Sequence, residues 1–427
     1  MTGEGLAQTS LKPETSGAAG TYVLRWPDLV TITIDRVDDD SHHVVSGEIT
    51  VRTLLPTDRG LVHQARLNLT STTSRVSLVR HLKERVPEMV DLWPQIIEYA
   101  TVWVLQQHRQ GEPMERLWHV KPPEGITYRF RPLLLEGQVN LLFGAGGIGK
   151  SFLSQWIAYC VDAAYNYPDE GWDVEPGTVL YLDYERDKNL HRRRLDAIRA
   201  GVLQVGVEDH IEYRRCYRPL VDEITDLRRM CYEAKVDLLI VDSAGGAAGG
   251  EAESNEMAIK TIMALRSLGI TALIIAHEPK NAENKTPFGA SYWTNLPSSV
   301  WRVRADLEPG SNEVTLGLYH HKVNDGRLLK PFGYKLTFVN DAEDKLQSVR
   351  FEHSSIMDSS VLAESVSTVE RAAEVLKKHG AMSNKALAEE LNVKADSLRM
   401  KLNQPRWKRR FGKDGMDNWH LLDTVHG

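Results

Sequence analysis

The chain has 427 residues, more than one hydrophobic core usually organises, so we expect two to four domains. Apolar residues make up 42% and charged residues 26%, as in ordinary soluble globular proteins, and a net charge of −6 excludes a chain that coats nucleic acid along its whole length. The three cysteines do not favour a disulfide framework, and no apolar run approaches the length of a membrane span. These features predict a cytoplasmic protein without membrane contact.

The N-terminal part is predicted to be a tail followed by a small α+β module. Residues 1–20 are small and polar, which is typical of a flexible tail. In residues 21–110, apolar and polar residues alternate from Val30 to Asp35, which indicates a strand, and two more strands are expected before two helices. Proline and glycine in residues 111–125 predict a linker.

Residues 126–352 have the pattern of an α/β domain. Apolar strands alternate with helical stretches, which predicts a mostly parallel sheet with helices on both faces. After about Ser298 only strands follow, and we expect them to extend the same sheet in antiparallel fashion at one side. Residues 353–366 are small and polar and predict a second linker, before a last module at 367–427.

A complete phosphate-binding loop lies between a strand and a helix of this domain. Its glycines allow the backbone to fold around a triphosphate, with N–H groups and the positive end of the helix dipole facing the oxygens. Lys150 is expected to reach the β- and γ-phosphates, and the Ser151 hydroxyl to bind Mg²⁺. A glycine-rich turn with a chance lysine is the alternative, but the flanking strand and helix do not favour it. The predicted ATP-binding residues are Gly144, Ala145, Gly146, Gly147, Ile148, Gly149, Lys150, Ser151 and Phe152.

Three further strands end in polar side chains. The apolar run from Val236 ends in Asp242, which is expected to share Mg²⁺ with Ser151, unless it only caps the strand. Another strand ends in Asp183-Tyr184-Glu185, where Glu185 is the candidate that polarises the attacking water and Asp183 is the alternative. A third ends in His277, a candidate sensor of the γ-phosphate, although a lone histidine is more often structural.

Together these residues resemble the RecA superfamily, and within it the RepA-like branch related to the hexameric DnaB-like replicative helicases. The likeness covers about residues 126–351. It includes the phosphate loop continuing into Phe152, the acidic strand end followed by Arg192-Arg193-Arg194, and the strand ends at Asp242 and His277. The resemblance implies that Glu185 is the hydrolytic acid. It also implies a homo-oligomer, with a hexamer favoured, in which Lys322 is a basic finger completing the site of a neighbouring subunit.

In such an oligomer, loops near the centre are expected to contact single-stranded DNA. The candidate is the segment 281–294, with Lys285 to neutralise phosphate and the aromatic pair Tyr292 and Trp293 to stack bases; the glycine-rich segment 244–251 is a weaker one because it is not basic. The alternative for both segments is that they are ordinary surface loops without a role in DNA binding.

The last module is predicted to be three helices and a hairpin, the pattern of a winged helix-turn-helix. Basic residues concentrate on its third helix and hairpin within an otherwise acidic chain, which indicates DNA, and duplex DNA in particular; protein contact or ring assembly is the alternative. The candidates are Lys394, Arg399, Lys401, Arg406, Lys408, Arg409, Arg410 and Lys413.

The sequence therefore predicts an Mg²⁺- and ATP-dependent motor that acts on DNA, of the replicative or repair-helicase type. A phage or mobile-element origin is suggested only by the resemblance, because members of that branch commonly come from such elements. A second hypothesis is an ATP-switched DNA-binding regulator or assembly platform that does not unwind DNA. A third, a small-molecule kinase, leaves the basic C-terminal module without a role and lacks an arginine-rich lid.

Overall fold

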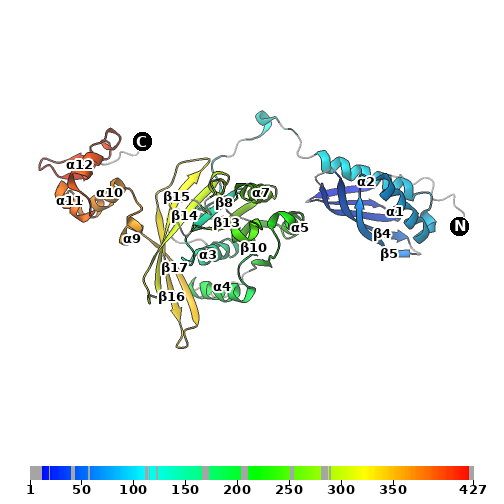
Figure 1. The fold of residues 1–427 in the computed structure, drawn as a ribbon, viewed down its shortest axis with the longest axis horizontal. Coiled ribbons are helices and arrows are strands. Elements are labelled where there is room, and N and C mark those ends of the chain that lie inside the picture. The colour runs from blue at the N-terminus through cyan, green and yellow to red at the C-terminus, as the bar shows by residue number, and fades with distance from the viewer. Residues whose placement is uncertain are drawn as a thin grey trace. The chain divides into compact units, whose positions relative to one another are not determined.

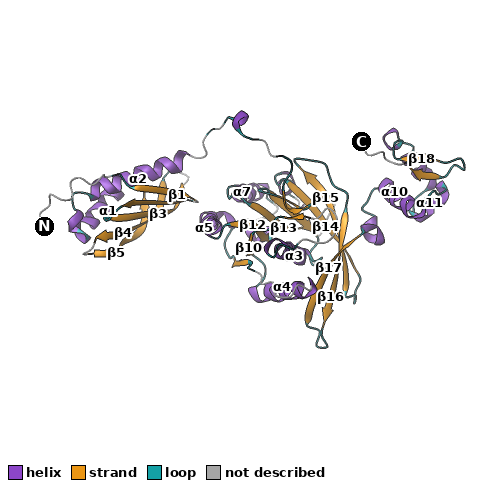
Figure 2. Cartoon of the chain, turned by 180° about the vertical axis from the view of Figure 1, so that it is seen from behind, coloured by secondary structure: helices purple, strands orange, loops and turns teal. Residues whose placement is uncertain are grey.

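The computed structural model describes residues 12–18, 20–39, 44–55, 58–110, 114, 116–121, 124–165, 173–202, 210–250, 254–279, 287 and 290–422. The chain divides into two compact units, one made of residues 1–125 with 218–236 and the other of residues 126–217 with 237–427. Figure 1 and Figure 2 show their elements from opposite sides.

The first unit contains a five-stranded antiparallel meander with helices against one face. Its strands β1 (Glu14–Ala18), β2 (Thr21–Trp26), β3 (Val30–Asp39), β4 (Val45–Leu55) and β5 (Asp58–Asn68) pair in chain order. Alternate side chains such as Ile32 and Ile49 are fully buried, in one core with α1 (Thr72–Arg85) and α2 (Trp93–Gln110). The helix α5 (Leu220–Glu233) is grouped with this unit and pairs Asp226 with Arg36 of β3.

The end of the predicted tail is instead ordered. Residues Glu14–Ala18 pair antiparallel with β2 as an edge strand, so the expectation of a tail through residue 20 is wrong for this segment. Gly20, at φ +76, closes the turn between the two strands, a conformation that glycine adopts without strain. Small polar residues are compatible with an edge strand because only one side of it pairs with a neighbour.

The second unit is built on a nine-stranded sheet with the order β11-β10-β12-β13-β8-β14-β15-β16-β17. Large side chains of α3 and the last strand meet in its core, where the rings of Trp156 and Phe351 stack at 4.9 Å. The strands are β8 (Val139–Gly144), β10 (Thr178–Asp183), β11 (Glu212–Arg215), β12 (Val236–Asp242), β13 (Thr271–His277), β14 (Ser299–Leu307), β15 (Glu313–Val323), β16 (Phe332–Asn340) and β17 (Leu346–Ser354). The main helices are α3 (Lys150–Asp162), α4 (Lys188–Val202) and α7 (Asn255–Arg266).

The α/β prediction is confirmed, with one difference in where the antiparallel part begins. β14 still runs parallel to β8, and the antiparallel pairs are β14–β15, β15–β16 and β16–β17. A small sheet of β6 (Tyr128–Arg131), β7 (Leu134–Leu135) and β9 (Asp173–Val174) lies beside it in the fold. Helix α4 approaches β17 so closely that a Cβ at Gly201 would meet the Val349 carbonyl oxygen at 2.0 Å.

The predicted linker at 353–366 is largely packed structure. It contains the short helices η4 (Ile356–Asp358) and α9 (Ser360–Ala363), whose Ile356 and Leu362 are buried. Tyr319 donates a hydrogen bond to the Leu362 carbonyl, and Ser359 donates one to Asp306. Isolated apolar residues in a polar sequence gave no periodic pattern, so this segment could not be predicted as ordered.

The C-terminal module has the predicted order of three helices and a hairpin. The elements are α10 (Thr368–His379), α11 (Asn384–Glu390), α12 (Ala395–Leu402), β18 (Phe411–Lys413) and β19 (Trp419–Leu421). Ser383 caps α11 by accepting a hydrogen bond from the Ala386 amide, as expected. Leu376, Leu387, Leu398 and Trp419 form one buried core. None of the helices in the described ranges has the length and hydropathy needed to cross a bilayer.

Candidate nucleotide hydrolysis site

The phosphate loop joins β8 to α3 at the centre of the sheet. Gly149 has φ +97, which favours glycine, and a Cβ at Gly144 would lie 2.4 Å from the Val303 carbonyl oxygen. Lys150 is 4% exposed. Its Nζ donates to the carbonyl oxygens of Gly144 (2.9 Å) and Ala145 (2.5 Å), and burial lowers its pKa to about 8. The loop therefore holds a buried cation at the place where phosphate would bind.

Glu185 and His277 complete a chain of polar contacts that begins at Lys150. His277 Nδ1 lies 3.3 Å from Lys150 Nζ, and its Nε2 lies 3.0 Å from Glu185 Oε1. This arrangement suits the tautomer with hydrogen on Nε2, because Nδ1 then accepts from Lys150. The same Glu185 oxygen accepts a hydrogen bond from Ser243. The hydrogen bonds from His277 and then Ser243 lower the pKa of Glu185 to about 2, so its carboxylate is ionised at neutral pH.

Asp242 and Ser151 lie together on the other side of the loop. Asp242 ends β12, is 3% exposed, and shares a hydrogen bond with the Ser151 hydroxyl. Tyr181 donates to Asp242 Oδ2 over 2.7 Å. Burial nevertheless raises the pKa of Asp242, which means that the present donors do not fully compensate its charge.

The Ser151 and Asp242 oxygens fit the site of a Mg²⁺ ion. A hydroxyl and a carboxylate are hard oxygen ligands, and Mg²⁺ commonly takes one or two protein groups with the rest from phosphate and water. Among the described residues, no three histidine, cysteine, aspartate or glutamate side chains gather into a metal site. Such a cluster is not required here, because the nucleotide itself supplies ligands to the ion.

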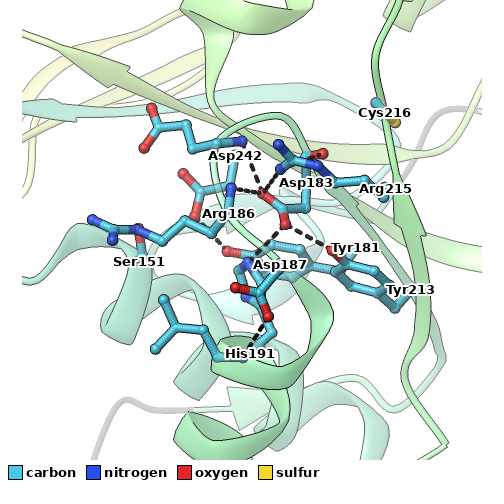
Figure 3. Close-up of polar contacts among 12 residues, drawn as sticks. Ser151, Tyr181, Asp183, Arg186, Asp187, His191, Tyr213, Arg215, Cys216 and Asp242 are labelled. Carbon is cyan, nitrogen blue, oxygen red and sulfur yellow. Dashed lines mark hydrogen bonds and ion pairs between the residues drawn. The ribbon is translucent and has the colours of Figure 1, made fainter.

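The Asp183 side chain does not face the phosphate loop. Its side chain is fully buried and accepts from Tyr213 and from the backbone amides of Glu185 and Arg186. Figure 3 shows these donors converging on it from β11 and from the following turn. Its oxygens are occupied, so the alternative assignment of Asp183 as the acid that polarises water is wrong, and Glu185 alone meets His277.

A cavity of about 250 Å³ opens beside the loop, and its lining adds Arg194 and Phe338 to the residues that the sequence placed in the site. Arg194 of α4 lies 4.7 Å from the ring of Phe152, which also packs edge-to-face on Phe338 of β16. The Arg194 Nη1 atom is buried with no hydrogen-bond partner in the described structure, and burial lowers the pKa of the guanidinium. The sequence shows the arginines that follow Glu185, but only the packing of α4 shows that Arg194 is the one that turns toward the cavity.

Lys322 lies on β15, away from this chain of contacts. Its Nζ donates to the carbonyl oxygens of Asn295 (2.6 Å) and Pro297 (2.5 Å), and burial lowers its pKa. A role in a neighbouring subunit remains a prediction, and it requires that the ammonium leave these two carbonyls.

Of the single-strand contacts predicted in the core, the structure contradicts one. Trp293, in α8 (Tyr292–Asn295), is 0% exposed, so its assignment as a base-stacking residue is contradicted; its neighbour Tyr292 is 39% exposed. Lys285 lies outside the described residues. The first part of the glycine-rich segment forms the buried helix α6 (Ala244–Ala248) because its alanines pack inward.

The predicted DNA-binding basic residues of the C-terminal module are exposed except for Arg410, which is half-buried, and several of them have side-chain partners. Arg410 forms a double ion pair with Glu370, at 2.5 and 2.8 Å, so its predicted contact with DNA is replaced by an internal role. Lys413 pairs with Asp417, Arg399 with Asp396, Lys401 bonds to Thr368, and Arg406 to Gln404. Lys394, Lys408 and Arg409 are exposed.

This geometry defines the class: a phosphate loop between a parallel strand and its helix, with an acid pair at the ends of neighbouring strands, is that of a P-loop nucleoside triphosphatase domain. Residues 108–283 match the family model described as an AAA domain, which supports ATPase activity for this part of the chain. A comparison with curated proteins gives no match. Among solved structures, the chain is similar to a KaiC-like protein from Pyrococcus horikoshii OT3, with a TM-score of 0.39 and 13% identity over 54% of this chain and 100% of the other.

Proposed function

We propose that the chain is an oligomeric, Mg²⁺-dependent ATPase whose hydrolysis is coupled to DNA binding, as in a replicative or repair-type helicase. The observation that carries the hydrolytic part is the contact chain from Lys150 through His277 to Glu185. It connects the cation that would hold the β- and γ-phosphates to the carboxylate that would accept a proton.

In this proposal, the oxygen of a water molecule bonds to the γ-phosphorus while the bond to the β–γ bridging oxygen breaks. Glu185 takes the proton of the water, and ADP leaves with the bridging oxygen. Lys150 and the inward-facing Arg194 stabilise negative charge on the phosphates. Ser151 and Asp242 would hold Mg²⁺, which supplies further neutralisation of phosphate charge.

His277 is suited to report the state of the γ-phosphate. Its ring touches both Lys150 and Glu185, so the loss of phosphate from Lys150 changes one partner of the ring directly. The residues that follow β13 would carry that change outward, which is how strand-end sensors couple hydrolysis to movement.

The coupling to DNA is supported by charge in the C-terminal module. Exposed Lys394, Lys408 and Arg409 suit contact with phosphate, and the order of helices and hairpin is compatible with a winged helix-turn-helix, which would bind duplex DNA. Single-stranded DNA would contact the core near Tyr292 in place of Trp293. A homohexamer with Lys322 acting across the interface belongs to the same proposal.

One observation favours a second candidate, an ATP-switched DNA-binding regulator without unwinding activity. The exposed basic residues assigned to DNA lie in the C-terminal module, while Trp293, one of the two aromatic residues predicted to stack bases in the core, is buried. A switch needs only the first of these surfaces.

Phosphate release by the full chain, measured with Mg²⁺-ATP alone, with single-stranded DNA and with duplex, separates these functions. A motor is expected to hydrolyse ATP faster with DNA and to displace a strand. Lys150→Ala, which removes the phosphate-binding cation, is the control for contaminating ATPases. Hydrolysis that DNA does not change excludes the motor, and DNA binding gated by ATP without strand displacement supports the switch.

A further inference from the structure

Asp183 is a buried carboxylate whose hydrogen bonds reach the backbone that carries Glu185. It lies at the end of β10 and is 0% exposed. Its Oδ1 accepts from the backbone N–H of Glu185 at 2.9 Å and of Arg186 at 2.8 Å. One carboxylate oxygen therefore fixes two successive amides of the turn that follows the strand.

The carboxylate is itself held from two other elements. Tyr213 of β11 donates to its Oδ2 at 2.7 Å, and Arg215 of the same strand lies 3.1 Å from Oδ1. His191 of α4 lies 3.3 Å from Oδ2. Figure 3 shows the three side chains around Asp183, with Arg186 on the turn. The main chain also links Asp183 to the end of β11, because the Cys216 amide donates a hydrogen bond to the Asp183 carbonyl.

This arrangement separates the roles of two acids that lie two residues apart. Asp183 points into the layer between β10, β11 and α4, whereas Glu185 points to His277 and Ser243 beside the phosphate loop. The Glu185 side chain can stay at 3.0 Å from His277 Nε2 only while the turn keeps its conformation, and the turn is held through its amides by Asp183.

We propose that Asp183 is a positioning residue that fixes Glu185 for the hydrolysis step, with Tyr213 and Arg215 of β11 as its anchor. This inference rests on the proposed ATPase function. The carboxylate contacts neither nucleotide nor water in the reaction. A displacement of Glu185 by about 1 Å is enough to slow a step that depends on alignment by roughly 100-fold.

The test uses the full-length chain with Asp183→Asn and Tyr213→Phe, and with Asp196→Asn as the matched control. Asp196 lies on α4 with a half-exposed side chain paired to Arg192, so the control makes the same chemical change away from the turn. Three quantities are compared with the wild type: kcat for ATP, the affinity for a fluorescent ATP analogue, and the hydrogen-exchange rates of the Glu185 and Arg186 amides.

We expect kcat to fall by roughly 10- to 100-fold in Asp183→Asn and several-fold in Tyr213→Phe, with nucleotide affinity within two-fold. The two amides should exchange at least ten-fold faster in Asp183→Asn and remain unchanged in Asp196→Asn. A merely structural role would lower the melting temperature without this split between kcat and affinity.

A folded Asp183→Asn protein with wild-type kcat and wild-type exchange overturns the inference. If Asp183→Asn does not fold, Tyr213→Phe decides, and wild-type kcat there overturns it. A different result would refute the ATPase proposal itself, namely that the wild type releases no more phosphate than Lys150→Ala. Even then, the exchange rates of the two amides still show whether Asp183 holds the turn.

Discussion

Two buried aspartates end neighbouring strands of the sheet, and their surroundings shift their pKa values in opposite directions. Asp183 of β10 receives hydrogen bonds and ion pairs from β11, α4 and its own turn, and despite burial these lower its pKa. Asp242 of β12 has Tyr181 and Ser151 as neighbours, and burial raises its pKa. A buried carboxylate whose oxygens all have hydrogen-bond donors is suited to a structural role. A buried carboxylate whose charge is not fully compensated is suited to bind a cation that arrives with the substrate.

The largest effect is expected from Asp242→Asn. Loss of the metal-binding charge should lower ATP turnover by roughly 100- to 1,000-fold, since metal stabilisation of the phosphates is worth several kcal/mol. The melting temperature without nucleotide should stay the same or rise, because a raised pKa means that the ionised group costs stability at neutral pH. Phosphate release and circular dichroism measure the two; an unchanged rate would break the assignment.

Asp183→Asn, unlike Asp242→Asn, should lower the stability of the folded protein. Removing a fully paired buried charge leaves its donors unmatched, so we expect the free energy of unfolding to fall by about 2–4 kcal/mol. Because its folded pKa is lowered, the stability from Asp183 is fully present above about pH 4 and is lost as pH falls below the unfolded value. Urea unfolding at pH 7 and pH 3 tests this, and equal losses in the variant and the wild type on acidification would contradict it.

A pH effect of about 25-fold is expected at Lys150. Its pKa of about 8 means that the free protein loses this cation as pH rises above that value. Phosphate needs the charged form, so affinity for an ATP analogue should fall by roughly 25-fold between pH 7.5 and 9.5. Lys150→Arg keeps its charge throughout this range and should give a flat profile. A wild-type profile as flat as that of the arginine variant would show that Lys150 does not titrate there.

The smallest effect is expected from Tyr181→Phe. It removes the hydroxyl that orients Asp242 while keeping the ring, so the Mg²⁺ concentration for half-maximal hydrolysis should rise by roughly ten-fold. Turnover at saturating Mg²⁺ should change little. An unaltered Mg²⁺ requirement would separate Tyr181 from the metal site.

The sequence predicted the parts of the site that follow one another along the chain. The phosphate loop, Asp242 and His277 each end a strand, and parallel strands bring such ends to one edge of the sheet. It favoured Glu185 but left Asp183 open as the alternative, because the contacts that distinguish the two acids come from Tyr213 and Arg215 in β11, some 30 residues further along the chain.

Burial explains the remaining differences. Trp293 and Arg410 look available to DNA in the sequence, but Trp293 of α8 is buried in the core and Arg410 pairs with Glu370 within the C-terminal module. Glu370 lies 40 residues from Arg410, and the burial of Trp293 is set by tertiary packing, so composition alone assigned both residues to the surface. The segment after β17 shows the same limit, since its apolar residues are too few for a periodic pattern.

The central claim is that Glu185, held by His277, is the group that takes the proton during ATP hydrolysis. Single-turnover phosphate release by Glu185→Gln, measured beside its affinity for ATP, tests it most directly. We predict that release slows by at least roughly 100-fold while affinity stays within a few-fold of the wild type, because the amide keeps the shape but cannot accept the proton. Release at the wild-type rate with ATP bound normally would contradict the account.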